Sequence, residues 1–156
     1  MGILAGKYLN IPLPQSDKRL VTIAETDGCT VDGISAATGC TVGHRTLRVE
    51  DYGKIAATFI DKEFSGAIRI APHADIRNRA HEFAPPGSSK WNAYLAGYQT
   101  MPDEVLLSVQ SVRLLIPIEK IVSTPGRKVL CQHCGEEIMN EREVCRNGQI
   151  LCISCA

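Results

Sequence analysis

Alternation of apolar and polar side chains predicts several β-strands in the first part of the chain. Residues 19–25 (RLVTIAE) alternate in this way and include Val21 and Ile23, which favour strands. Four later segments have a related pattern. The predicted strands are residues 19–25, 46–49, 54–61, 66–71 and 107–116. The link Phe64-Ser65-Gly66 between the third and the fourth strand suits a hairpin.

Apolar residues at helical spacing predict the helices. Residues 1–10 have this spacing, and Pro12 and Pro14 prevent the pattern from continuing. The predicted helices are residues 1–10, 31–38, 73–83 and 91–98, with a further short turn of helix from Met101. The order of helices and strands predicts an α+β fold, in which helices pack on a mixed, mostly antiparallel sheet.

A change of composition near residue 123 predicts a domain boundary. Residues 123–128 (STPGRK) have the composition of a linker, and residues 129–156 hold five of the seven cysteines. We therefore expect a main domain of residues 1–122, a linker of residues 123–128 and a small C-terminal module of residues 129–156.

The cysteines of the C-terminal module predict a zinc site. They form two Cys-X-X-Cys pairs that are 17 residues apart, a spacing typical of a four-thiolate zinc finger. Asn147-Gly148 between the pairs favours a hairpin turn that would bring the second pair back beside the first. The predicted ligands of this structural Zn²⁺ are Cys131, Cys134, Cys152 and Cys155. We expect Cys145 to be a small buried side chain of the hairpin and His133 to be solvated.

Composition and charge narrow the class of protein. The chain has 17 basic and 17 acidic side chains, so its net charge gives no general attraction to nucleic acid or to an anionic membrane surface. No apolar run approaches the roughly 20 residues of a membrane span, and the first residues lack the pattern of a signal peptide. An odd number of cysteines, most of them in Cys-X-X-Cys pairs, favours metal thiolates in a reducing compartment. These features predict a cytoplasmic protein.

A glycine-rich stretch, residues 25–52, is the second candidate site. It carries Cys29, Cys40 and His44 among small and polar residues. Two thiolates and an imidazole would give a metal three ligands and leave a fourth position open, as in catalytic zinc sites. Two other interpretations stay open. The cysteines would form a redox pair if their Cα atoms came within about 7 Å, or they would be small buried residues that pack the helix on the sheet.

The same stretch resembles a known family. The segments ETDGCTVDGISAATGCTVG and VEDYGKIAATFID, followed by the Cys-X-X-Cys tail, are similar to those of FmdE proteins, which take their name from formylmethanofuran dehydrogenase. The resemblance implies an α+β domain, often a homodimer, with a transition-metal site built partly from the Cys29 loop. It also implies a C-terminal zinc finger and a link to molybdenum or tungsten enzymes of one-carbon metabolism. The family's His-Gly-His-X-Cys-Pro-Gly signature precedes the residues aligned with 2–9, so we expect a shortened N-terminal region.

Two classes of function follow from these patterns. The first is a metal-binding protein with an accessory or small-molecule-binding role of the FmdE type. The alternative is an interaction module whose zinc finger binds a protein. Nucleic acid is disfavoured as its partner, because the acidic side chains of the module offset its basic ones. No Gly-rich dinucleotide fingerprint, P-loop or Ser-His-Asp motif indicates an enzyme in its own right.

Overall fold

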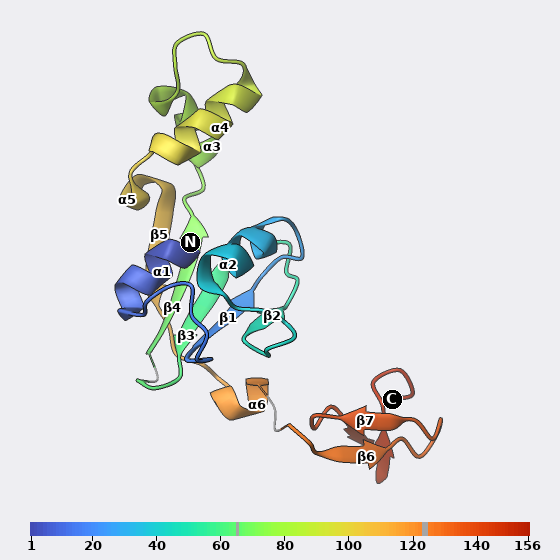
Figure 1. The fold of residues 1–156 in the computed structure, drawn as a ribbon. Helices are drawn as coiled ribbons and strands as arrows, with labels where there is room; N and C mark the ends of the chain where they lie inside the picture. Colours follow the sequence, from blue (N-terminus) through green and yellow to red (C-terminus); the bar gives the residue numbers. More distant parts are fainter. Residues whose placement is uncertain (65, 123–124) are drawn as a thin grey trace. The chain divides into compact units, whose positions relative to one another are not determined.

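The computed structural model describes residues 1–64, 66–122 and 125–156 and divides into two compact units (Figure 1). The first unit is Met1–Arg113 and the second is Leu114–Ala156. The second unit therefore begins before the expected linker, of which Ser123 and Thr124 lie outside the described residues. Ser65, in the expected hairpin link, also lies outside them.

A five-stranded sheet forms the centre of the first unit, at the places that the alternation predicts. The strands are β1 (Leu20–Ala24), β2 (Leu47–Val49), β3 (Ala57–Asp61), β4 (Gly66–Pro72) and β5 (Leu107–Ser111). Their order is β2-β1-β3-β4-β5. The β1–β2 pair is parallel, and the other three pairs are antiparallel. The prediction of a mixed, mostly antiparallel sheet is confirmed.

The last strand is shorter than predicted. It ends at Ser111, which pairs with Ile68 near the start of β4. Val112 still donates its N–H to Ala67, and the residues after it run past the end of β4. Alternation in residues 112–116 therefore does not make a strand, because the backbone there has passed its partner.

Two helices cover one face of the sheet, and their apolar sides build the core (Figure 1). These are α1 (Gly2–Leu9) and α2 (Thr30–Thr38). Leu4 of α1 and Ile34 of α2 belong to the same buried cluster as Phe59 and Ile70 of the sheet. This arrangement holds the loop between β1 and α2, which carries Cys29, at the end of a central strand.

The segment between β4 and β5 forms a helical lobe, which we define as residues 76–100. It contains α3 (Ile76–Arg79), the 3₁₀ helix η1 (Ala80–Phe83) and α4 (Lys90–Thr100), and the short α5 (Asp103–Leu106) follows it. The predicted helix 73–83 is thus split into two short pieces. Ala80 and Ala93 are fully buried between η1 and α4. Gly97 lets the two helices approach so closely that an added Cβ would collide with the carbonyl group of Ala80.

This close contact gives a testable prediction for the lobe. Gly97→Ala is expected to lower the free energy of unfolding by about 2 kcal/mol, because the backbone of η1 has to move away. Gly33→Ala in α2 is the matched control, since no atom lies within 4 Å of its added Cβ. The control is expected to stabilise the protein by about 0.5–1 kcal/mol through helix propensity. Urea denaturation measures both values, and equal unfolding midpoints for the two variants would contradict the packing described.

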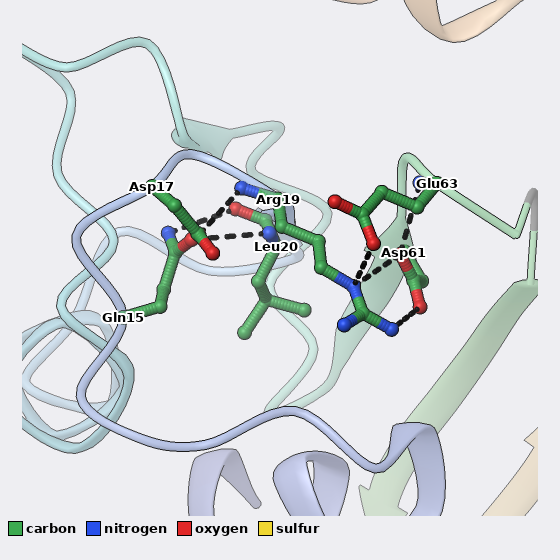
Figure 2. Close-up of polar contacts among 6 residues, drawn as sticks. All are labelled: Gln15, Asp17, Arg19, Leu20, Asp61 and Glu63. Atoms are coloured by element: carbon green, nitrogen blue, oxygen red, sulfur yellow. Dashed lines mark hydrogen bonds and ion pairs between the residues drawn. The ribbon is translucent and has the colours of Figure 1, made fainter.

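Two buried ion pairs tie β1 to its neighbours. Arg19, just before β1, donates two hydrogen bonds to Asp61 of β3, at 2.9 and 2.7 Å (Figure 2). Arg69 of β4 binds Glu25, just after β1, in the same bidentate way at 2.6 and 2.7 Å. The Gln15 side chain bonds both backbone groups of Leu20, as Figure 2 shows. The central strand is therefore fixed at both ends by polar contacts as well as by its apolar packing.

The second unit contains α6 (Ile118–Val122), which the sequence pattern did not predict, and two small hairpins. The first hairpin pairs β6 (Lys128–Leu130) with β7 (Glu137–Met139), and the second pairs β8 (Val144–Arg146) with β9 (Gln149–Leu151). Asn147 and Gly148 have φ values of 51° and 77°, so the predicted hairpin turn is confirmed. In the described residues of both units, no helix is long and apolar enough to cross a membrane.

Candidate metal centre

Each Cys-X-X-Cys pair follows a short strand of the second unit. Cys131 and Cys134 come directly after β6, and Cys152 and Cys155 come directly after β9. Gly135, at φ 75°, closes the first turn and donates its N–H to the carbonyl of Cys131 at 2.9 Å. Few side chains adopt this left-handed conformation, so glycine suits the position. Both turns thus present two sulfur atoms from one tight loop.

The structure brings the four predicted zinc ligands together. Their sulfur atoms all lie within 4.8 Å of one another, and the Cys134 and Cys152 sulfurs are 4.0 Å apart. A tetrahedral zinc ion with Zn–S bonds of about 2.3 Å needs sulfur atoms about 3.8 Å apart. The four cysteines therefore have the donor atoms and nearly the spacing for a tetrahedral metal ion.

The pKa values of the thiols show what a cation would supply. Backbone N–H groups of Cys134 and Cys152 hold the pKa of Cys131 down to about 6, so this thiol is ionised at neutral pH. The neighbouring sulfurs, Cys152 foremost, raise the pKa of Cys155 to about 12. Further thiolates would add like charges to the same small volume. Four thiolates can thus coexist only around a cation that offsets their charge.

The apolar core around this centre is small. Among the described residues of the unit, Ile138 and Leu151 are the buried aliphatic side chains beside Cys131, and Val129 and Ile150 pack against them. A core of this size supplies little folding free energy, so bound metal would supply most of it. Cys145 is exposed, which corrects the prediction that it is buried, because its strand β8 has no second layer packed on it. His133 is exposed, as expected.

The structure does not gather the three residues of the second candidate site. Cys29 is exposed at the N-cap of α2, and His44 is exposed in the loop before β2. Cys40 is fully buried, where Gln15 and Thr22 approach its sulfur at 3.6 and 3.5 Å. Within the described part of the chain, the tail cysteines are the one group of three or more His, Cys, Asp or Glu ligand atoms close enough to share a metal. The surroundings of Cys40 fit the packing interpretation.

Sequence reasoning missed the carboxylate and guanidinium groups beside the Cys29 loop. Glu25 precedes this loop and is mostly buried against Arg69. The hydrogen bonds from Arg69 hold the pKa of Glu25 below its ordinary value. An arginine inside the apolar strand GAIRIAP was the available signal, because a buried arginine requires an acidic partner.

Comparisons with known proteins agree with this architecture. The family model described as "FmdE, Molybdenum formylmethanofuran dehydrogenase operon" matches residues 1–108. An FmdE-like protein of tungsten formylmethanofuran dehydrogenase from Syntrophus aciditrophicus has a similar fold, with a TM-score of 0.57 and 24% identity. That likeness covers 98% of this chain and 81% of the other.

A probable S-adenosyl-L-methionine-binding protein of Archaeoglobus fulgidus is 27% identical over 88% of this chain. The chain spans 40% of the length of that relative. The family model matches well over half of the sequence, and its match takes in the strands β1 to β4 and the helices between β1 and β5. The chain therefore belongs to the FmdE family.

Proposed function

We propose that this chain is a metal-binding accessory protein of molybdenum- or tungsten-dependent one-carbon metabolism. The observation that carries the metal-binding part is the convergence of the four tail thiols within 4.8 Å of one another. The description of the family, which refers to the formylmethanofuran dehydrogenase operon, supports the metabolic part. The proposal assigns no catalytic step to the chain.

Zinc is the ion that we propose for the tail. Four thiolates in a tetrahedral arrangement suit Zn²⁺, which has no preferred geometry of its own and tolerates small unevenness in the sulfur positions. Four protein ligands also fill the coordination sphere of the ion. A filled sphere leaves no position for water or substrate, so we assign this zinc a structural role.

The protein is further proposed to act in the cytoplasm as a homodimer. The reducing cytoplasm would keep Cys29, Cys134 and Cys145, which are exposed, in the thiol form until metal binds the second of them. The homodimer is the association that family membership favours.

Metal content and thiol reactivity together test the proposed centre. The purified full-length chain is expected to hold one zinc per chain by elemental analysis. Cys29 and Cys145 are exposed and lie outside the centre, so two thiols should react rapidly with a chromogenic disulfide reagent. Removal of zinc by a chelator should then expose the four tail thiols as well, while Cys40 should react only after denaturation. Rapid reaction of the tail thiols before chelation would contradict the four-thiolate centre.

A further inference from the structure

The outer side of α4 carries an apolar surface that the chain itself leaves uncovered. Trp91, Leu95 and Gln99 are spaced four residues apart, so they share one side of the helix, and we call them the α4 ridge. The exposed fractions are 73% for Trp91 and 54% for Leu95. Lys90 is the one charged residue in α4. A helix that faces only water normally carries charged residues on its outer side, so this ridge has the composition of a contact surface.

The same unit contains an apolar groove. The groove lies between α1, α2 and α5 and has a volume of about 420 Å³. Its apolar lining includes Ile3, Ala37 and Leu106, and Ile3 is 65% exposed. Gly33 of α2 adds room, because an added Cβ at this residue would meet no atom within 4 Å. We call this cavity the α1–α2 groove.

We propose that the α4 ridge of one chain docks into the α1–α2 groove of a second copy, and that the second copy returns the same contact. The ridge does not fill the groove of its own chain, since Trp91 and Leu95 remain exposed. Each chain has one ridge and one groove, so a reciprocal exchange closes after two copies. The inference rests on the homodimer of the proposed function and names its interface.

Charge at the two surfaces agrees with this pairing. Asp103 lies at the groove, where it forms an exposed ion pair with Lys7 at 3.1 Å. Lys90 precedes the ridge and would bring a positive charge toward the carboxylate of Asp103. The ridge itself brings no charge into the apolar part of the groove. Tryptophan is also among the residues that contribute most to protein interfaces, which suits Trp91 as the anchor of the contact.

Two substitutions test the ridge and the groove independently. Leu95→Glu places a charge on the ridge, and Gly33→Leu fills the groove from a position whose Cβ meets no other atom. The full-length wild-type chain is expected to sediment at twice the 17.0 kDa mass of one chain, whereas each variant should sediment as a monomer. Val42→Glu and Gly43→Leu are the matched controls, because Val42 is also an exposed aliphatic residue, Gly43 is equally open and neither lines the groove. Both controls should remain dimeric.

Trp91 provides a second readout, since it is the only tryptophan of the chain. Its fluorescence emission should lie at shorter wavelength in the dimer and move to longer wavelength in both monomeric variants. A mixture of Leu95→Glu and Gly33→Leu chains keeps one intact ridge and one intact groove. The mixture should therefore dimerise at higher concentration than the wild type, and a mixture that stays monomeric would contradict the exchange.

The outcomes separate this inference from the proposed function. A wild-type dimer that survives Leu95→Glu or Gly33→Leu would overturn the ridge and groove while leaving the homodimer in place. A wild-type chain that is monomeric at every concentration would overturn both. Circular dichroism should show that all four variants are folded, because every substituted side chain lies on an open surface.

Discussion

Replacing Cys134 with serine is expected to empty the metal centre and unfold the second unit while the first unit stays folded. The substitution leaves three thiolates for a site that needs four. Zinc binding of this type contributes on the order of 10 kcal/mol to folding, and the few buried apolar side chains of the unit do not replace it. The first unit has its own core around Phe59 and Ile70 and is independent of the metal.

Metal analysis and limited proteolysis measure this outcome. Zinc content should fall from one per chain to nearly zero, and protease should remove residues after about 114 while sparing the first unit. Cys145→Ser is the matched control, because Cys145 is an exposed cysteine of the same unit outside the group of ligands. One tightly bound zinc in the Cys134→Ser protein would refute the assignment of that ligand.

Asp61→Asn is expected to destabilise the first unit by about 3 kcal/mol, because it leaves the Arg19 guanidinium without its buried counter-charge. The side chain of Asp61 is 3% exposed and that of Arg19 is 18% exposed, so water replaces little of the lost interaction. Urea denaturation of wild type and variant gives this difference. Asp103→Asn removes an exposed ion pair with Lys7 and should cost less than about 1 kcal/mol. Equal losses for the two variants would contradict the dominance of the buried pair.

The same ion pair makes stability depend on pH. Hydrogen bonds from Arg19 hold the pKa of Asp61 below its ordinary value of 3.8 in the folded state. A lowered carboxyl pKa stabilises the fold at pH values above the unfolded pKa, and the contribution is lost as pH falls from about 4 through the folded pKa. Glu25 beside Arg69 acts in the same direction. The wild type should therefore lose stability more steeply below about pH 4 than Asp61→Asn, measured by thermal unfolding across this range.

Local patterns predicted the parts of this structure that depend on neighbouring residues. The five strands follow from alternation, and the hairpin at Asn147-Gly148 follows from residues that tolerate positive φ. The tail cysteines could be identified as ligands because each Cys-X-X-Cys turn fixes two sulfurs locally. One further turn then has to bring the two pairs together.

Contacts between distant segments were beyond these patterns. The partners of Arg19 and Arg69 are 42 and 44 residues away in sequence, and nothing local to either arginine names them. Cys29 and Cys40 are close in sequence, yet α2 separates them, so that one thiol faces water and the other enters the core. Spacing alone does not show on which side of a helix boundary a side chain becomes buried. The end of β5 depended likewise on where β4 begins.

The position of β1 in the sheet has a consequence for synthesis on the ribosome. Both strands that flank β1 come later in the chain, at residues 47–49 and 57–61, and the apolar faces of α1 and α2 rest on Phe59 and Ile70. The nascent polypeptide therefore keeps these early helices without a surface to cover until about residue 70 has left the exit tunnel. Chaperones that bind exposed apolar segments have their longest opportunity during this interval, before β3 and β4 emerge and complete the centre of the sheet.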